Sequence, residues 1–280
     1  MSVPAAPNGE TPAQAYERRL VPALFAPSAT LAARLAAIAH GERIVDVACG
    51  TAIGLRAAAA QSGSLGAAVG VDNDLDMVTA ARDALDAAGV LADVLVASAT
   101  ALPLPDASFD VCLCLQGLQF FDDRMAALRE MRRLLAGPGR LVVSTWAALE
   151  HVPGHRAVYA ALEAQGIDTA SPRRGFSLHE PHELLELATL AGFSEVSVEV
   201  EEREASFASS MHFIEALFEG APYTRRVTAS LSEHQRRRCV EDARQRLRPF
   251  ESSSGLKLPL RSHLLLASVR PVTVPTASFA

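Results

Sequence analysis

A turn of small residues follows the first run of β-branched residues in this 280-residue chain. Residues 44–54 read IVDVACGTAIG, and an Ala-rich helical segment, 55–61, comes directly after them. Small residues let a backbone approach a ligand closely, and the first turn of a helix presents N–H groups that have no partner within the helix. This stretch therefore predicts a strand, a turn and a helix that bind a nucleotide-like ligand.

An acidic residue ends the next run. Residues 69–73 read VGVDN. Asp72 follows the turn by about 20 residues, where an acid is placed to accept hydrogen bonds from both hydroxyls of a ribose. Further strands are expected over 94–99, 111–115 and 140–146. Because strands alternate with helical segments, the sequence predicts a parallel sheet with helices on both faces.

Beyond this pattern, the chain resembles the class I S-adenosylmethionine-dependent methyltransferases. It is most similar to their ubiquinone/menaquinone-biosynthesis-like branch (methyltransferase type 11), which is common among small-molecule methyltransferases. The resemblance implies an α/β Rossmann-like fold with a seven-stranded sheet, mostly parallel, whose last strand inserts antiparallel between the fifth and sixth. It also implies S-adenosylmethionine as the cofactor. The blocks that carry it cover about residues 40–147 and read VDVACGTAIG, VGVDN, ALPLPDASFDVCLCLQGLQFF and ALREMRRLLAGPGRLVVSTW.

A dinucleotide oxidoreductase shares the first strand, turn and helix and is the competing interpretation. Such enzymes normally show G-x-G-x-x-G in the turn, whereas this turn has Ala48, Gly50 and Ala52. The segment LPLPDASFD, 102–110, and the Pro-Gly turn before the fifth strand have no counterpart in those enzymes. The methyltransferase interpretation is therefore preferred.

The resemblance implies a set of cofactor contacts. Asp46 points toward the cofactor's amino group, although a strand acid also serves the hydrogen bonding of the fold. Asp72 takes the ribose hydroxyls, with an ordinary strand-end or N-cap acid as the alternative. The remaining implied contacts, with the methionine part, the ribose or the adenine, are Ala48, Gly50, Thr51, Asn73 and Met77.

Two positions depart from the family's pattern. Ala52 stands where many relatives have Gly, and we expect the extra methyl to tighten the turn without abolishing binding. Ser98 stands where the family has an Asp that accepts from the adenine amino group, while the N–H of Ala99 still donates to the ring. Because a hydroxyl is a weaker and neutral acceptor, we expect cofactor binding to persist, weakened on the order of 1 kcal/mol.

The loop after the fourth strand is implied to close over the transferable methyl group. Gln116 and Gln119 are candidates for contacts there, with capping of the loop as the alternative for each. Phe120 and Phe121 are expected to pack this loop on the core.

The implied reaction is an in-line displacement at a sulfonium methyl, in which the protein mainly positions the nucleophile and excludes water. A general base is needed only if the nucleophile carries a proton of high pKa. His151 and His155 follow the fifth strand, where many relatives place a base. His151 is the first candidate, and exposed loop histidines are the alternative for both.

Substrate contacts are expected from His151, from the N-terminal helix and from segment 204–258. Tyr16 closes over the methionine carboxylate or the substrate, unless it is a helix-packing aromatic. Segment 204–258 carries an apolar stripe at helical spacing, a pattern that more often packs on a core than lines a pocket. Its candidates for substrate contact are Met211, Phe213 and Phe218.

We expect a single domain over 1–280. Helices are predicted over 15–25, 28–39 (with Ser28 as its N-cap), 74–88, 123–135 and 179–191, and two late strands over 195–200 and 263–269. The predicted parts are an N-terminal helical arm or lid (1–40), a cofactor-binding core (41–147), the end of the core with a substrate loop (148–203), a helical cap insertion (204–258), and the last strand with a tail (259–280).

Composition limits the partners. The net charge of -6 and the pI of ≈ 5.8 argue against a polyanion such as nucleic acid. No apolar run approaches the roughly 18 residues needed to span a bilayer, and no signal-peptide pattern opens the chain, so we expect a cytoplasmic protein without membrane binding. The 4 cysteines are too scattered for a disulfide framework or zinc site, and no metal is expected. The sequence leaves open whether the protein forms a homodimer.

The expected function is S-adenosylmethionine-dependent methyl transfer to a small organic acceptor, hydrophobic and belonging to secondary metabolism. Oxygen, nitrogen and carbon all stay open as the attacked atom. One alternative is a relative that binds the cofactor and catalyses another reaction, such as a cyclisation. Another, of a different class, is a non-catalytic cofactor-binding or regulatory module.

Overall fold

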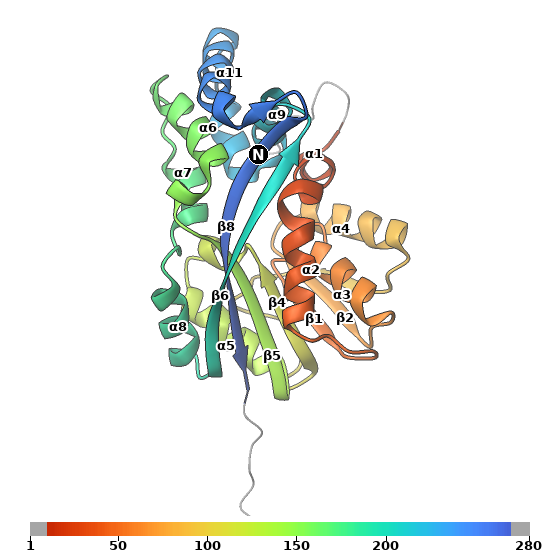
Figure 1. The fold of residues 1–280 in the computed structure, drawn as a ribbon. Helices are drawn as coiled ribbons and strands as arrows, with labels where there is room; N and C mark the ends of the chain where they lie inside the picture. Colours follow the sequence, from red (N-terminus) through yellow and green to blue (C-terminus); the bar gives the residue numbers. More distant parts are fainter. Residues whose placement is uncertain (1–9, 270–280) are drawn as a thin grey trace, which may run out of the picture.

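Eight strands form one sheet in the computed structural model, which describes residues 10–269 (Figure 1). Their order is β3-β2-β1-β4-β5-β8-β6, and β7 pairs with β8 off this path. The predicted Rossmann-like sheet is confirmed, with the two-residue β7 as an addition. The strands are β1 (Ile44–Val47), β2 (Ala68–Asp72), β3 (Asp93–Val96), β4 (Phe109–Leu115), β5 (Leu135–Trp146), β6 (Ser194–Phe207), β7 (Glu251–Ser252) and β8 (Gly255–Ser268).

The last strand runs against its neighbours. β1 to β5 pair in parallel, whereas β8 pairs antiparallel with both β5 and β6. Leu265 of β8 lies opposite Val143 on one side and Val198 on the other. The last strand therefore lies between the fifth and sixth, as the resemblance implied. The carboxyl ends of β1, β2 and β4 consequently meet at one edge, the place where open parallel sheets bind ligands.

Helices cover both faces of the sheet, as the alternating pattern predicts. α2, α3 and α4 share a buried cluster with one face, and α5 and α8 share a cluster with the other. The helices are α1 (Pro12–Arg19), α2 (Ala26–Leu35), α3 (Ile53–Ser62), α4 (Leu75–Ala88), α5 (Arg124–Leu134), α6 (Pro153–Glu163), α7 (Ala170–Arg173), α8 (Pro181–Leu190), α9 (Ser210–Gly220), α10 (Pro222–Thr228) and α11 (Glu233–Leu247). Shorter turns are η1 (Val21–Phe25), η2 (Leu118–Phe120), η3 (Leu149–His151), η4 (Arg174–Phe176) and η5 (Arg248–Phe250).

Apolar strand residues alternate between the two faces, so the central strands are buried on both sides. In β1, Ile44 belongs to the cluster with α2 to α4, and its neighbour Val45 belongs to the cluster with α5 and α8. A third cluster includes Trp146 at the end of β5, Leu162 of α6 and Phe213 of α9. The cap therefore shares this core, called the cap core below, with α6, the N-terminal helices and the ends of β6 and β8.

The N-terminal helices differ from the prediction. α1 begins directly after Thr11, because Thr11 and Gln14 form a reciprocal capping box. A π-helical turn, Val21–Phe25, leads directly into α2. Ser28 lies inside α2, so its predicted role as an N-cap is wrong. Its hydroxyl instead donates to Glu201 Oε2 on β6 at 2.6 Å.

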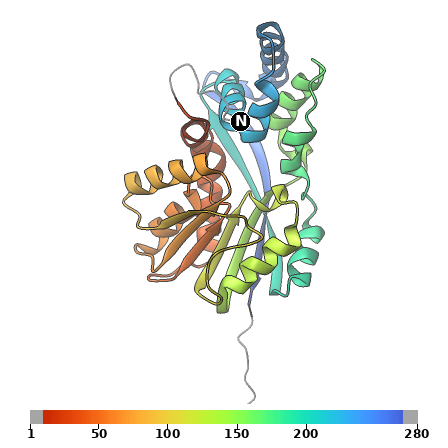
Figure 2. The same ribbon diagram turned by 180° about the vertical axis from the view of Figure 1, so that it is seen from behind.

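β6 and β8 are longer than predicted. Each is 14 residues long, where the sequence indicated a short strand. They stay paired up to Phe207 and Leu256, and this extension forms a two-stranded ribbon that reaches α9 and α11 (Figures 1 and 2). The cap insertion therefore spans 208–254, between the two strand ends.

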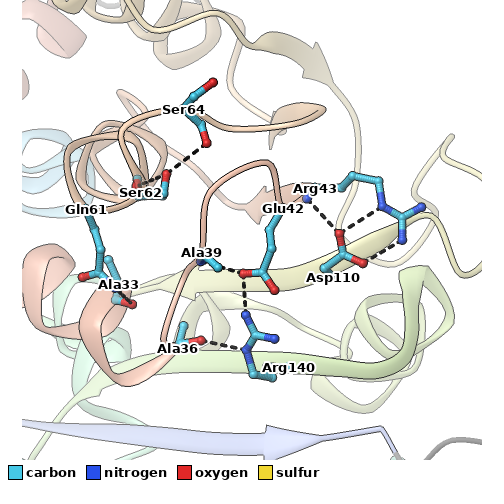
Figure 3. Close-up of polar contacts among 11 residues, drawn as sticks. Ala33, Ala36, Ala39, Glu42, Arg43, Gln61, Ser62, Ser64, Asp110 and Arg140 are labelled. Carbon is cyan, nitrogen blue, oxygen red and sulfur yellow. Dashed lines mark hydrogen bonds and ion pairs between the residues drawn. The ribbon is translucent and has the colours of Figure 1, made fainter.

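Charged pairs join the amino ends of β1, β4 and β5, at the edge opposite the carboxyl ends (Figure 3). Arg43, just before β1, pairs with Asp110 of β4 at 2.7 Å, and this contact lowers the pKa of Asp110. Glu42 pairs with Arg140 of β5 at 2.6 Å, and Arg140 also donates to the carbonyl of Ala36. Because these side chains are partly exposed, they fix the register of the strands more than they add stability.

No helix within residues 10–269 is both long and apolar enough to cross a membrane. Residues 1–9 of the predicted arm and residues 270–280 of the predicted tail lie outside the described part of the chain.

Candidate active site

Three cavities adjoin at the carboxyl ends of β1, β2 and β4. The main cavity, ≈ 270 Å³ in volume, lies between these strand ends and the cap. The turn cavity lies under the turn after β1, and the side cavity lies beside the ends of β2 and β3. Ala48 lines all three cavities. The site is therefore centred where the strand order reverses, between β1 and β4.

The turn after β1 is tightly wound. Gly50 has φ 53, and Ala48 and Ala52 have φ values of 57 and 61, in the left-handed region. Alanine adopts this region at a cost of roughly 1–2 kcal/mol, which explains why the family favours Gly at Ala52. The same conformation persists here with Ala. It turns the N–H of Gly50 toward Asp72, whose Oδ2 accepts it at 2.9 Å.

Asp46 lies on β1 at the wall of the turn cavity. Its side chain is buried, and Oδ1 has no hydrogen-bond partner among the described residues. Burial, with a smaller contribution from Asp72, raises the pKa of Asp46 to about 8. A Cβ at Gly54 would lie 2.3 Å from Asp46 Oδ2, so only glycine fits beside this carboxyl. A buried carboxyl oxygen without a partner is the arrangement that a ligand ammonium would complete.

Asp72 ends β2 and lines both the main and the side cavity. Its Oδ1 accepts the N–H of Asp74 at 3.0 Å, and burial raises its pKa. Each carboxylate oxygen keeps a second lone pair, so two ribose hydroxyls fit in addition to the backbone donors. Asn73 lines the same two cavities, and Met77 of α4 lines the main one. These three predicted cofactor residues are brought together.

The side cavity contains the two predicted adenine-facing residues, Ser98 and Ala99. Its walls combine small or apolar residues such as Val71 and Ala97, which suit a flat ring, with the acids Asp122 and Asp123. The hydroxyl of Ser98 lies 2.8 Å from Thr100 Oγ1, so it is already hydrogen-bonded within its own loop.

The two glutamines after β4 occupy different layers. Gln116 has φ 60 and lines the main and turn cavities. Gln119 is buried behind it and lines none of the three cavities. Its Nε2 donates to Gln116 Oε1 at 2.9 Å. Of the two candidates, Gln116 therefore lines the cavities, and Gln119 contacts it from behind.

The N-terminal helix covers the turn. Tyr16 lines the main and turn cavities and stacks on Phe25 with ring centroids 5.2 Å apart. Burial and the nearby Asp72 raise the pKa of Tyr16, so its hydroxyl stays protonated. Thr51 lines the turn cavity and donates to Glu17 Oε2 at 2.5 Å. Residues of α1 therefore cover the turn cavity.

The two candidate histidines have opposite environments. His151 is exposed, lies 3.2 Å from an Arg261 guanidinium nitrogen, and does not line the main cavity. Its position corrects the expectation that it faces the substrate, because η3 turns it away before α6 begins. His155 is buried in the first turns of α6 and lines the main cavity.

His155 is surrounded by aromatic rings. The centroids of Trp146, Tyr159, Phe176 and Phe213 lie 5.6, 6.1, 5.7 and 5.8 Å from its own. Its Nδ1 is buried without a partner among the described residues, and burial lowers its pKa to about 4. The imidazole is therefore uncharged at neutral pH.

The acceptor-side wall differs most from the prediction. Met211, Phe213 and Phe218 do not line the main cavity. Phe213 and Phe218 pack in the cap core, where Arg236 covers the ring of Phe218, and Met211 is only partly buried. From α9 only Leu217 reaches the cavity. Residues that the sequence reasoning missed line it instead, namely Trp146, Tyr159, Phe176, Tyr223, Thr224 and Arg226.

Phe120 and Phe121 were expected to pack on the core, and both also line the main cavity. Phe120 stacks on Tyr223 of α10, with ring centroids 4.7 Å apart and planes inclined by 7°. Within the described chain, no group of three or more His, Cys, Asp or Glu side chains is arranged to hold a metal ion.

Comparisons with known proteins agree with this geometry. The family model described as "Methyltransferase domain" matches residues 45–143. The ubiquinone/menaquinone biosynthesis C-methyltransferase UbiE of Paraburkholderia phymatum is 37% identical over 103 residues, which are 37% of this chain and 42% of that protein. The chain thus spans less than half the length of this curated relative.

Two solved structures share the fold. Phosphoethanolamine N-methyltransferase 2 of Haemonchus contortus, in complex with phosphomonomethylethanolamine and S-adenosylhomocysteine, superposes with TM-score 0.58 and 18% identity, covering 94% of this chain and 57% of that one. The [4+2]-cyclase SpnF superposes with TM-score 0.53 and 20% identity, covering 89% and 81%. At these identities the likeness shows the fold alone, and a fold hosts more than one chemistry.

The family match covers the turn, Asp72 and the strands that carry them. Residues 45–143 therefore match the methyltransferase domain family, and over this stretch the chain is similar to the ubiquinone/menaquinone biosynthesis C-methyltransferases.

Proposed function

We propose that the protein transfers the methyl group of S-adenosylmethionine to a small, planar, hydrophobic acceptor bound in the main cavity. The observation that carries this proposal is the continuity of the three cavities. Gly50 and Gln116 line both the main and turn cavities, and Asp72 lines both the main and side cavities. An acceptor in the main cavity thus lies beside the cofactor's expected place.

The residues present fit S-adenosylmethionine at three places. The unpartnered oxygen of Asp46 suits an ammonium group, Asp72 has lone pairs left for a ribose, and the walls around Ala99 suit a flat ring. When bound, S-adenosylmethionine supplies an electrophilic methyl group on a positively charged sulfur. Asp72, together with Asp46 once it ionises, adds negative charge around this part of the site, which favours a cationic ligand.

The walls of the main cavity support a planar acceptor. Trp146, Phe176 and Tyr223 line it from three different elements, and aromatic rings bind flat apolar groups by stacking and by burying their surface. The enclosing rings also exclude water from the reacting atoms. We also propose that the acceptor is a secondary metabolite, because the chain resembles a branch that is common among small-molecule methyltransferases.

His155 acts in this proposal as a neutral hydrogen-bonding partner of the acceptor. A general base works best with a pKa near the working pH, and the pKa of His155 is about 4. Taking a proton from a hydroxyl of pKa about 10 would be uphill by roughly 8 kcal/mol. The site therefore favours an acceptor that reacts without a strong base, such as an ionised hydroxyl, an amine or an enol carbon.

The proposal is tested first by titrating the purified protein with S-adenosylmethionine in a calorimeter, alongside Asp72→Ala. Formation of S-adenosylhomocysteine is then followed across a panel of aromatic hydroxyl, amine and enol acceptors. Binding in the micromolar range together with turnover of any acceptor supports methyl transfer.

The alternatives give different results. Tight cofactor binding without turnover of any acceptor would contradict the proposal, and would favour a cyclisation or rearrangement catalyst or a regulatory module. Absence of cofactor binding to the wild-type protein would contradict the cofactor assignment itself, and nicotinamide and other nucleotides would then be the next ligands to titrate.

A further inference from the structure

The main cavity has a basic side chain that the proposed methyl transfer does not use. Arg226, on α10, is the one Lys or Arg side chain among the described residues that line this cavity. It is also exposed to solvent, so it stands where the cavity opens. A cation at the mouth of an aromatic cavity is a candidate for substrate selection.

Arg226 has no carboxylate partner within the described part of the chain. Its described contact is with the ring of Tyr223, whose centroid lies 5.4 Å from the guanidinium carbon. Arg236 makes the same kind of contact with Phe218 and also pairs with Glu219 at 3.9 Å. The charge of Arg236 is therefore balanced by the protein, whereas that of Arg226 is left for solvent or a ligand.

The aromatic ring that the guanidinium of Arg226 contacts is held in place by its own neighbours. Tyr223 stacks on Phe120, and the carbonyl of Phe120 accepts a hydrogen bond from Arg174 at 2.9 Å. A Cβ at Gly175 would lie 3.2 Å from the Phe120 ring, so the ring is packed on its other side. A stacked guanidinium keeps its N–H edge free to bind an oxyanion.

The remaining charged residues of the cavity favour an anion that carries a single negative charge. Asp72 and Asp74 line the same cavity, so its cofactor side carries negative charge. Two carboxylates against one arginine disfavour a dianion such as phosphate, whereas a carboxylate matches one guanidinium in both charge and geometry.

We propose that the acceptor is a planar aromatic carboxylic acid, whose ring binds among Trp146, His155 and Phe176 and whose carboxylate is bound by Arg226. This inference rests on the proposed methyl transfer, because that reaction is what makes the bound acid an acceptor. Binding of the acid itself does not require turnover. A charge-assisted hydrogen bond at a partly exposed site gives about a tenfold preference for the acid over a neutral analogue, or about 1.4 kcal/mol.

The test measures binding rather than activity. Protein saturated with S-adenosylhomocysteine is titrated with three matched pairs: 4-hydroxybenzoate, 4-hydroxyphenylacetate and 4-hydroxycinnamate, each against its primary amide. The three acids hold the carboxylate at increasing distances from the ring. We expect at least one acid to bind about tenfold more tightly than its amide, with the preference decreasing as salt is raised.

Variants assign the preference to one residue. Arg226→Gln is expected to bring the acid-to-amide ratio to about one, and Arg226→Lys to retain part of it. Arg129→Gln, an exposed arginine on α5 outside the three cavities, makes the same change in net charge and is expected to leave the ratio unchanged.

Two results would overturn the inference: no acid preference in the wild-type protein across the three pairs, including no binding of any of them, or a preference that survives Arg226→Gln. A preferred acid that binds but is not methylated would leave the inference standing and count against the proposed function. The two failures are therefore distinguishable.

Discussion

The strand ends and turns that line the cavities on the β1–β3 side come from one stretch of chain, 46–100, which Tyr16 of α1 covers, whereas the wall on the cap side comes from segments scattered between Trp146 and Arg226. The first wall consists of strand ends and a tight turn, fixed by the ladder of the sheet. The second consists of side chains from the end of β5 and from separate helices. From this difference we expect cofactor binding and acceptor choice to be energetically separable, since substitutions at distant positions without shared partners add independently. Each prediction below changes a residue of one wall or a residue directly behind it.

The largest effect is expected from Asp72→Ala. The substitution removes a carboxylate placed for two ribose hydroxyls, and each hydrogen bond to a charged group contributes about 1.5–3 kcal/mol, so affinity for S-adenosylmethionine should fall about 100-fold or more. Calorimetry measures it, with Asp93→Ala, an exposed acid at the start of β3, as the control. An equal loss of acceptor affinity in the S-adenosylhomocysteine complex would contradict the expected independence of the two walls.

Asp46 makes cofactor affinity depend on pH. Because its pKa is about 8, raised by burial and by Asp72, the carboxyl is mostly protonated at pH 7 and must ionise to pair with an ammonium group. Affinity should therefore rise by up to about tenfold per pH unit from pH 6 until pH approaches 8. In Asp46→Asn this rise should disappear. A pH-independent wild-type affinity would contradict the assignment.

The same residue should lower stability at high pH. Its pKa is higher in the folded chain than its ordinary value of 3.8, so between these values the folded state holds a proton that the unfolded state has released. Stability from this group is therefore lost as pH rises toward 8. Asp46→Asn is expected to raise the unfolding free energy at pH 8 by more than about 1 kcal/mol, as measured by urea denaturation.

His155→Phe tests the acceptor wall. The ring packing among Trp146, Tyr159 and Phe176 is kept, while the hydrogen-bonding nitrogens are lost. We expect kcat/KM for the acceptor to fall about tenfold, with affinity for S-adenosylmethionine unchanged. In the wild-type enzyme, no inflection from this group should appear between pH 5.5 and 9. An inflection near pH 7 that vanishes in the variant would instead identify His155 as a base.

The smallest effect is expected from Gln119→Leu. This change removes the donor that orients Gln116 without touching a cavity wall, and a buried glutamine with an unpartnered Oε1 contributes little stability. We expect kcat to fall about threefold with both binding constants unchanged. Equal values of kcat in variant and wild type would show that Gln116 is oriented by Ser144 alone, whose oxygens accept its N–H.

Much of the cofactor wall could be predicted from the sequence because its chemistry is local. Asp46, Gly50 and Asp72 sit at strand ends or in a turn, and a strand end places its side chain at the edge of the sheet whatever packs elsewhere. The left-handed φ of Ala52 also follows from the family's preference for Gly there. The fold was predictable for the same reason.

The acceptor wall was less predictable because it depends on long-range packing. A stripe of apolar residues at helical spacing marks a buried face, but it does not say whether that face meets a core or a cavity. Phe213 and Leu217 are one helical turn apart, and both pack in the cap core, but only Leu217 also lines the main cavity. The histidines show a usable signal: Pro153 favours a helix start, which puts His155 in its first turn and leaves His151 outside.

The ribbon formed by β6 and β8 has an evolutionary consequence. The cap leaves the ribbon at Phe207 and returns at Leu256, and these two residues are paired in the ladder. Both ends of segment 208–254 therefore leave the sheet at one point, although the segment also packs on α1 and α6. An exchange of this segment between relatives would have to preserve those packed faces. It would replace the part of the main-cavity wall formed by residues 217–226 and leave the strand ends that line the cofactor side unchanged.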